Sequence, residues 1–539
     1  MSSSLEIVLP LDDADNDKKQ RAQAAQLLNV APENISEIRV RRRSLDARRA
    51  PIRVRLLCDI WTNEVAPPET LQQIEYSKLH SNVRPNQTVV IIGCGPAGMF
   101  AALELIRCGI KPIVIERGKD VQSRRRDLAQ LTRMGTVDAD SNYCFGEGGA
   151  GTYSDGKLYT RVKDKAAIRK TLETLVAHGA PDDILVEAHP HIGSNKLPKV
   201  VAAMRETILQ NGGEIRFNAR VIDFLIENSR MRGVILQNGD EVTGDATILA
   251  AGHSGREIFE ILQRHRVLVT SKPFALGVRI EHPQPLIDAI QYRHARFEKQ
   301  ANGEWRHPKL PAASYRLAHE VDGRGVFSFC MCPGGWIVPS ATRGDEVVVN
   351  GMSLSRRDSP FANSGLVVSI ETEDLRDYEE HGAMAGMFLQ RDLETRARTL
   401  AGNSGDNGQK APAQRVVDFL KNRVSTSLPA CSYQPGIAAV SMSELLPDSI
   451  ARRLQIGLEQ FGRQMRGYVS EDALLIGVET RTSSPVRVPR DSETRQHPQI
   501  AGLFPCGEGA GYAGGIVSAA IDGTNSAQAC LAAIEYSIV

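Results

Sequence analysis

The chain has 539 residues, more than one hydrophobic core usually serves, so we expect two or three domains. Hydrophobic residues make up 42% and charged residues 24% of the chain, which is typical of a globular protein in water. The formal net charge of +1 argues against electrostatic capture by nucleic acid or by an anionic membrane.

The cysteines and the lengths of the apolar runs limit the possible class of protein further. Neither a basic, apolar leader nor a run of about 20 apolar residues is visible. The nine cysteines are scattered and include no C-x-x-C pair. We therefore expect a cytoplasmic protein with no membrane span, no disulfide framework and no metal site. Cys330 and Cys332 share a face if their segment is a strand, and core packing explains them more simply than redox chemistry.

Residues 1–85 predict a small, separate α+β domain. Leu5–Pro10 alternates like a strand, and Lys18–Leu28 has helical apolar spacing. Ile35–Arg43 and Pro51–Ile60 alternate like two further strands, and Ser81–Gln87 has the composition of a linker. The arginines of this region form either a docking surface for an anionic partner or, more simply, the solvated face of a hairpin. They are Arg39, Arg41, Arg42, Arg43, Arg48, Arg49, Arg53 and Arg55.

The strongest motif follows this domain. Thr88–Ile92 is a continuous apolar strand that runs into Gly93-Cys94-Gly95-Pro96-Ala97-Gly98. A helix over Met99–Cys108 and a second strand over Pro112–Ile115 come next, and this strand ends at Glu116. Glycines at these spacings allow a tight turn, a close phosphate and close helix packing, and the terminal acid suits a ribose. The segment therefore predicts a dinucleotide-binding fold with pyrophosphate at the helix N-terminus.

Two further stretches match the same glycine pattern. Gly146–Gly151 follows no apolar strand, and Gly509–Gly514 follows a strand at Leu503–Cys506 but precedes only one helix, Ile516–Tyr536. Neither is followed by a second strand with a terminal acid, so neither predicts a dinucleotide fold of its own. We expect both to close around the cofactor of the first fold.

The middle of the chain predicts mixed structure. Antiparallel strands are expected at Glu214–Phe217, Arg220–Ile226, Arg232–Leu236 and Glu241–Thr243, with a turn at Asn238-Gly239. Another apolar strand is expected at Ala246–Ala250. Between residues 271 and 467 we expect the strands Phe274–Ile280, Gly325–Cys330, Trp336–Pro339 and Glu346–Asn350, and the helices Met384–Thr399 and Ala413–Arg423.

The C-terminal segment favours FAD over NAD as the cofactor. The chain leaves the dinucleotide fold, builds a second region and returns as the strand Leu503–Cys506, which ends in Gly507-Glu508. In FAD enzymes of the two-domain type, such a return places an acid beside the ribityl and pyrophosphate arm. The helix after it, starting near Gly515-Ile516, would stabilise negative charge on a reduced flavin.

Several segments resemble one family, the bacterial uncharacterised FAD-dependent dehydrogenases. They are Val89–Leu105, Phe145–Leu158, Ala250–Arg256, Ala275–Pro283, Ser328–Gly335, Arg481–Arg487, Cys506–Ile516 and Ser44–Arg48. The resemblance implies bound FAD and an α/β fold in which a mixed α+β substrate domain interrupts a Rossmann-type FAD-binding domain. The expected parts are the N-terminal domain (residues 1–85), the first part of the FAD-binding domain (86–270), the substrate domain (271–467) and the second part of the FAD-binding domain (468–539). The resemblance implies no particular substrate.

The resemblance also implies the residues that contact FAD. These are Gly93, Gly95, Pro96, Ala97 and Gly98 at the pyrophosphate, Glu116 at the ribose, Arg117 and Val221 at the adenine, Ala251 and Gly252 behind the diphosphate, Gly148, Gly149 and Thr152 along the flavin, and Gly507, Glu508, Gly515 and Ile516 at the ribityl and ring. Glu508 replaces the Asp that is commoner in related flavoproteins.

Four residues are candidates for substrate binding or catalysis. Asp155 and Lys157 follow the glycine loop and either supply a proton or fix a turn. Arg279 either binds an acidic substrate or belongs to a surface strand. Arg481 flanks an anion-friendly loop and either clamps a carboxylate or phosphate, or serves structure.

The predicted function is that of an FAD-dependent oxidoreductase, a dehydrogenase or reductase acting on a small organic molecule. NADH or NADPH, if used, is expected as a transient donor, because no second nucleotide fold is visible. One alternative is a flavin-dependent nucleic-acid modifier or redox-sensing binding protein that docks through the N-terminal arginines. A lesser alternative is an aromatic monooxygenase, to which Gly335–Pro339 is faintly similar. Oligomeric state is left open.

Overall fold

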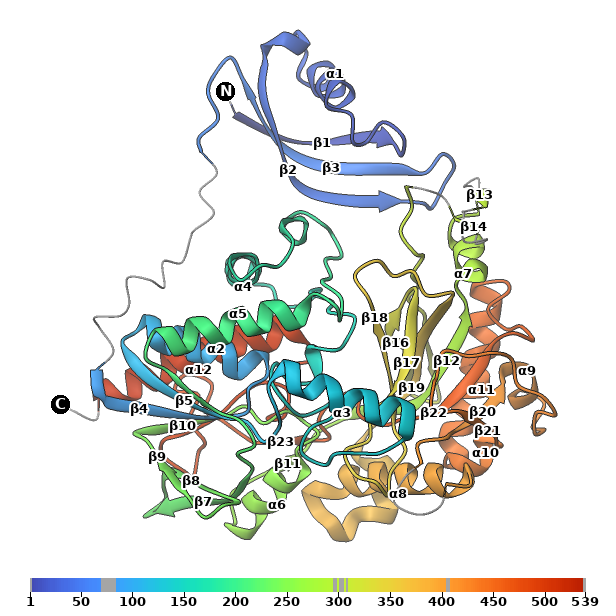
Figure 1. The fold of residues 1–539 in the computed structure, drawn as a ribbon. Helices are drawn as coiled ribbons and strands as arrows, with labels where there is room; N and C mark the ends of the chain where they lie inside the picture. Colours follow the sequence, from blue (N-terminus) through green and yellow to red (C-terminus); the bar gives the residue numbers. More distant parts are fainter. Residues whose placement is uncertain are drawn as a thin grey trace.

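The computed structural model describes residues 2–68, 84–293, 298–299, 305–306, 309–403 and 408–536. Figure 1 shows the N-terminal domain at the top of the view, above a Rossmann-type domain on the left and a second domain on the right. Part of the predicted linker, residues 81–83, lies outside the described residues, and the strand of the glycine motif begins at Arg84. Among the described residues, no helix combines the length and apolar character needed to cross a membrane.

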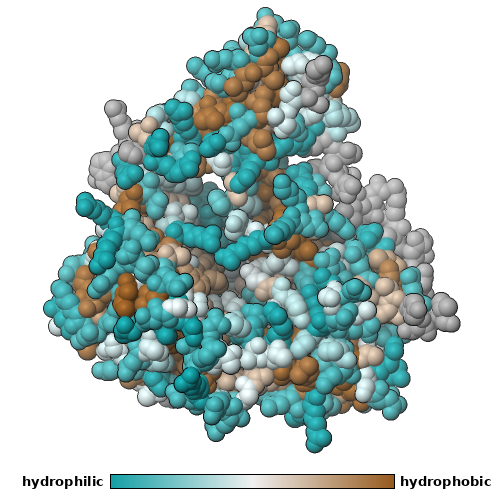
Figure 2. All heavy atoms as spheres, turned by 180° about the vertical axis from the view of Figure 1, so that it is seen from behind, coloured by the Kyte–Doolittle hydropathy of each residue, from teal (hydrophilic) through white to brown (hydrophobic). Residues whose placement is uncertain are grey.

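The N-terminal domain has the elements expected from its sequence. Its sheet has the order β1-β3-β2, formed by Ser2–Pro10, Arg53–Thr62 and Ile35–Asp46, with helix α1 at Asp17–Leu28 and a short turn η1 at Pro32–Asn34. Among the eight arginines named above, five pair with carboxylates, namely Arg39, Arg41, Arg43, Arg48 and Arg55. These pairs lower the net positive charge of the surface and favour the solvated-hairpin interpretation. Apolar atoms also gather on this domain, at the top of Figure 2.

The Rossmann-type domain is built on a five-stranded parallel sheet. The order is β24-β10-β4-β5-β6, from Leu503–Pro505, Ala246–Leu249, Arg84–Ile92, Ile110–Ile115 and Glu214–Arg216. Helices α2 (Pro96–Arg107), α5 (Leu197–Gln210) and α12 (Ile516–Tyr536) stack over one face (Figure 1). The predicted return of the C-terminal strand is confirmed, because β24 pairs with β10 in parallel register.

A small antiparallel sheet covers the other face. It has the order β7-β8-β9, formed by Val221–Glu227, Arg230–Leu236 and Glu241–Thr243. The placement of Glu214–Phe217 in this antiparallel group was wrong, because β6 instead pairs with β5 at the edge of the parallel sheet. Alternation predicts a strand but not its partner, and a half-buried edge strand of three residues fits either sheet.

The second domain contains a seven-stranded sheet of order β15-β16-β19-β12-β22-β20-β21. The strands are Ala318–Val321, Arg324–Cys332, Phe361–Ile370, Phe274–Pro283, Leu474–Glu479, Ala411–Arg415 and Ile437–Ala439. The sheet continues past the boundary expected at residue 467, because β22 pairs with both β12 and β20.

One predicted helix is much shorter than expected. Residues 413–415 of the expected helix Ala413–Arg423 belong to β20, and only Val416–Phe419 forms a short helix, α9. Strands β21 and β22 flank this segment and supply its hydrogen-bond partners, so tertiary pairing overrides the local helical pattern.

The remaining elements pack around these sheets. The helices are α3 (Val121–Met134), α4 (Lys165–Ala177), α6 (Arg256–Arg264), α7 (Gln284–Gln291), α8 (Ala385–Leu400), α10 (Met442–Leu445) and α11 (Asp448–Gln464), with short turns η3 (Gly149–Gly151), η4 (Asp182–Leu185) and η5 (Thr372–Met384). Paired short strands are β11 (Thr270–Ser271) with β23 (Val486–Arg487), β13 (Glu298–Lys299) with β14 (Trp305–Arg306), and β17 (Gly335–Pro339) with β18 (Val349–Ser353).

Candidate functional site

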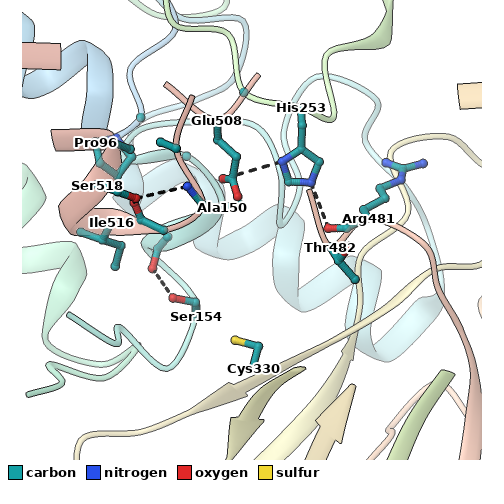
Figure 3. Close-up of a pocket in the computed structure, with 18 of the residues that line it drawn as sticks. Pro96, Ala150, Ser154, His253, Cys330, Arg481, Thr482, Glu508, Ile516 and Ser518 are labelled. Atoms are coloured by element: carbon teal, nitrogen blue, oxygen red, sulfur yellow. Dashed lines mark hydrogen bonds and ion pairs between the residues drawn. The ribbon is translucent and has the colours of Figure 1, made fainter. Parts of the chain in front are cut away.

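One large cavity lies between the Rossmann-type domain and the seven-stranded sheet. Its volume is about 1240 Å³, above the range of about 300–1,000 Å³ that holds one drug-sized ligand. The glycine motif lines one end, and Phe327–Met331 of β16 lines the other. Figure 3 shows Pro96, Ile516 and Glu508 on one side of this space and Cys330 standing on the strands of the sheet.

The glycine motif has the close packing expected of a pyrophosphate site. A Cβ on Gly98 would lie 1.9 Å from the carbonyl oxygen of Gly93, so α2 approaches β4 as only glycine allows. Gly93 has a φ of +104°, and a Cβ there would meet the carbonyl oxygen of Ala250 at 2.4 Å. At Gly95 a Cβ would meet only Gly149, at 3.9 Å, and Gly95 lines the cavity. The N-terminus of α2 therefore opens on space suited to an anion.

Glu116 organises the loops around this end. Its carboxylate accepts hydrogen bonds from the backbone nitrogens of Cys94 at 2.9 Å, Gly118 at 2.8 Å and Gly146 at 3.0 Å. The residue is buried and lines the cavity. A carboxylate has about four lone-pair sites, so one acceptor position is left for a ligand hydroxyl. The Glu116 side chain thus links the glycine motif, Gly93–Gly98, to a second glycine loop, Gly146–Gly151.

The second glycine loop, Gly146–Gly151, contacts the cavity through only one of the three predicted residues. The predicted Gly149 lines it together with Ala150 and Gly151, whereas the predicted Gly148 and Thr152 are outside the set of lining residues. The Thr152 hydroxyl donates to the carbonyl oxygen of Glu147 at 3.0 Å, and a Cβ on Gly148 would lie 1.9 Å from that hydroxyl. Both residues shape the loop from behind.

Most of the other predicted FAD contacts line the cavity. They are Pro96, Ala97, Arg117, Val221, Ala251, Gly252, Glu508, Gly515 and Ile516. Gly98 and Gly507 instead serve packing: a Cβ on Gly507 would lie 2.9 Å from the side chain of Ala97. The first turn of α12 begins at Ile516, directly after Gly514 and Gly515 at the cavity wall. Its positive end is thus directed at the cavity.

His253 is a cavity residue that the sequence analysis did not single out. Its Nδ1 lies 3.7 Å from a carboxylate oxygen of Glu508, and its Nε2 lies 3.0 Å from the carbonyl oxygen of Arg481 (Figure 3). A carbonyl oxygen only accepts, so Nε2 carries the proton. The only signal in the sequence was the position of His253 in Gly252-His253-Ser254-Gly255, after an apolar strand.

The predicted proton donors Asp155 and Lys157 form an ion pair. Asp155 is buried and lies 3.1 Å from Lys157 Nζ and 2.5 Å from Arg357 Nη2, and it accepts a short hydrogen bond from Ser353. Burial raises the pKa of Asp155, but the charges of Lys157 and Arg357 outweigh it and hold the pKa well below its ordinary value. Asp155 is therefore an ionised carboxylate at neutral pH, which favours the alternative that it fixes the turn over the alternative that it supplies a proton.

Arg279 and Arg481 are committed to buried carboxylates. Arg279 is fully buried outside the cavity lining, with Nη1 2.7 Å from Glu479, so the expected surface strand or substrate contact was wrong. Arg481 lies at the cavity wall, but its guanidinium pairs with Glu346 at 2.6 Å and Glu394 at 2.8 Å. Neither is available as an anion clamp, because a charge buried with its partner gains little from a third group.

Comparison with known proteins agrees with this site. Residues 86–140 match the model of an FAD binding domain, residues 273–482 that of an FAD-dependent protein, C-terminal domain-like, and residues 1–61 a domain of unknown function. An uncharacterised protein of Clostridium beijerinckii is 40% identical over 520 residues, 93% of each chain. The chain belongs to this family of FAD-dependent proteins.

Solved structures similar to this FAD-dependent protein are distant. A geranylgeranyl bacteriochlorophyll reductase-like protein of Thermoplasma acidophilum shares 12% identity with a TM-score of 0.35, covering 84% of this chain and 80% of its own. CtdE in complex with FAD shares 12% identity with a TM-score of 0.27, covering 84% of this chain and 82% of its own.

The residues present in this FAD-dependent protein fit the cofactor. The open Gly95 position, the remaining acceptor of Glu116 and the N-terminus of α12 lie along one wall of the same cavity. They match, in order, the needs of a pyrophosphate, a ribose and an electron-rich ring. The predicted FAD cofactor is thereby supported by the chain's own geometry.

Proposed function

We propose that the protein is an oxidoreductase that holds FAD against the glycine motif and admits a small organic substrate from the side of the seven-stranded sheet. The observation that carries this proposal is the continuity of the cavity from Gly95 to Cys330, across both domains. When bound, FAD supplies two-electron oxidation or reduction. The chain's own residues bind the cofactor, orient the substrate and limit the access of water.

The substrate end of the cavity carries cationic side chains. Lys157, Arg161 and Arg316 line it, and Arg161 and Arg316 are exposed there. The carboxylate in this region, Asp155, is already paired with Lys157 and Arg357. This balance favours a substrate that bears a carboxylate or phosphate.

The experiment is anaerobic reduction of the FAD-loaded protein by a panel of small donors. Within pairs of donors that differ only in a carboxylate, the donor that carries the carboxylate should bleach the flavin faster. Bound FAD that no small donor reduces, and that no acceptor reoxidises after chemical reduction, would contradict an oxidoreductase. A protein without bound flavin would contradict the proposal at its first step.

A further inference from the structure

Two cysteines lie at the substrate end of the cavity, on strand β16. Cys330 is exposed and lines the cavity, and Cys332 is buried behind it. The expectation that both serve core packing was therefore wrong for Cys330. Figure 3 shows the Cys330 side chain above the strands, facing the space bounded by Ser154 and Ile516.

The backbone is irregular at this point. Pairing of β16 with β19 is shifted between Phe329 and Cys332, which inserts one extra residue into β16. Cys330 has a φ of +44°, in the left-handed region that non-glycine residues rarely adopt. The Cys332 sulfur lies 3.3 Å from the carbonyl oxygen of Cys330. The bulge therefore places the Cys332 thiol beside the backbone of Cys330.

Two cations face this pair. Lys157 Nζ lies 3.9 Å from the Cys330 sulfur and 3.7 Å from the Cys332 sulfur. Arg279 Nη2 lies 3.9 Å from the Cys332 sulfur and donates to the carbonyl oxygen of Cys330 at 2.9 Å. The nearby carboxylates are both paired, Asp155 with Lys157 and Arg357, and Glu479 with Arg279.

These surroundings shift the pKa values of the two thiols in opposite directions. Interaction with the neighbouring Cys332 thiol, together with the charges of Lys157 and Arg279, lowers the pKa of Cys330 in spite of the charge of Asp155. The same interaction, together with burial, raises the pKa of Cys332. One thiolate stabilised by a neighbouring thiol is the arrangement found in dithiols that exchange with disulfides.

We propose that Cys330 and Cys332 form a thiol–disulfide centre that exchanges two electrons with FAD bound in the same cavity. The proposal rests on the proposed function only for the binding of FAD. Oxidation of the Cys330 thiolate and the Cys332 thiol forms one S–S bond and releases two electrons and one proton. FAD, the oxidant, accepts all three, and the reverse step returns them to the sulfurs.

Another cysteine at the cavity lacks these features. Cys144 also lines the cavity, but its sulfur lies 3.6 Å from both the carbonyl oxygen and the hydroxyl of Ser340. The sulfur of Cys144 thus contacts a serine, whereas Cys330 and Cys332 on β16 share the contact with Lys157.

Anaerobic reductive titration of the FAD-loaded protein tests the centre. After oxidation in air, the wild-type protein should take up four electrons per FAD, two in the ring and two in the disulfide. Cys330→Ser and Cys332→Ser should each take up only two. Cys108→Ser, at the partly exposed end of α2, should keep the wild-type value.

Peptide mapping gives a second readout that does not depend on activity. Differential alkylation and mass spectrometry should find a disulfide between residues 330 and 332 in the oxidised protein and two thiols after the titration. Retained FAD with no such disulfide, or with two electrons per FAD in the wild type, would overturn the inference alone. Loss of FAD from the wild type would instead count against the proposed function.

Lys157 serves as a positioning residue for the thiolate. In Lys157→Met, the pH at which Cys330 of the reduced protein becomes reactive toward iodoacetamide should rise by about 1–3 units. Lys157→Arg should keep the wild-type profile. An unchanged profile in a folded Lys157→Met protein would contradict the assigned stabilisation.

Discussion

The imidazole of His253 joins Glu508 to the second domain: its Nδ1 lies 3.7 Å from the Glu508 carboxylate and its Nε2 lies 3.0 Å from the carbonyl oxygen of Arg481. Glu508 follows β24, His253 follows β10, and Arg481 follows β22 of the other sheet. One ring thus links the two domains at the wall of the cavity. Glu508 lies beside this ring, at the place where we expect the ribityl arm.

Glu508→Ala should weaken FAD binding by about tenfold to a hundredfold. A hydrogen bond to a charged group contributes about 1.5–3 kcal/mol, which corresponds to that range in the dissociation constant. Titration of apoprotein with FAD, followed by flavin fluorescence, measures it. Glu260→Ala, which removes an exposed carboxylate from α6, is the matched control and should bind FAD normally. Equal affinities in the two variants would remove Glu508 from the site.

Glu116→Ala should lose both FAD and stability. The substitution leaves three backbone donors without their acceptor, and each buried unpaired group costs about 1–3 kcal/mol. Glu116→Gln keeps one acceptor oxygen and should be intermediate. Absorbance of the purified protein and thermal unfolding with and without added FAD give the two quantities. Full FAD occupancy in Glu116→Ala, or stoichiometric FMN in the wild type, would contradict the assignment.

A chain that begins at Arg84 should still bind FAD. The N-terminal domain meets the Rossmann-type domain through Arg43, whose backbone nitrogen donates to Val186 at 2.7 Å and whose carbonyl accepts from Ala188 at 2.9 Å. These contacts lie outside the residues that line the cavity. Lower solubility is expected because apolar surface is uncovered. A folded product with no affinity for FAD would show that the N-terminal domain contributes to the site.

Glu394→Gln should destabilise the protein at neutral pH by about 3–5 kcal/mol, the cost of breaking a buried ion pair. Burial raises the pKa of Glu394, but the charges of Arg256 and Arg481 outweigh it and lower the pKa to about 2. The stabilisation is therefore complete above pH 4.5 and is lost as the pH falls toward 2.

Urea unfolding at several pH values checks this dependence. The difference in unfolding free energy between wild type and Glu394→Gln should shrink steadily below pH 4.5. Glu459→Gln, exposed on α11, should show no such trend. A difference that stays constant with pH would mean that the carboxylate is not held ionised by the two arginines.

NADH and NADPH should reduce the flavin with similar, weak affinities, if they reduce it at all. The second glycine loop is a single turn at the cavity wall, and the third glycine pattern leads only into α12. Neither heads a second strand–helix–strand unit among the described residues. Stopped-flow reduction under anaerobic conditions measures both affinities. Saturation by micromolar NADPH with strong preference over NADH would reveal a dedicated nucleotide site.

The sequence by itself was enough to predict the dinucleotide fold and its cofactor end. The strand, the glycine motif, α2, β5 and Glu116 lie within about thirty residues of one another, as in any such unit. Their contacts are mainly with chain neighbours, so local periodicity and spacing encode them. The strands of the N-terminal domain were predictable from their alternation, whereas the pairing of β1 with β3 joins segments far apart in sequence.

The tertiary structure alone decided the roles of the reactive side chains. Arg279 contacts Glu479, which is 200 positions away in the sequence. Arg481 and Glu394 are 87 positions apart, and Lys157 and Cys332 are 175 positions apart. Whether a charged group binds a substrate or is already paired depends on which distant carboxylate the fold brings to it. The free energy of a buried charge depends on such partners, and no local pattern records them. The same holds for Cys330, whose exposure into the cavity follows from a bulge that sequence alternation does not reveal.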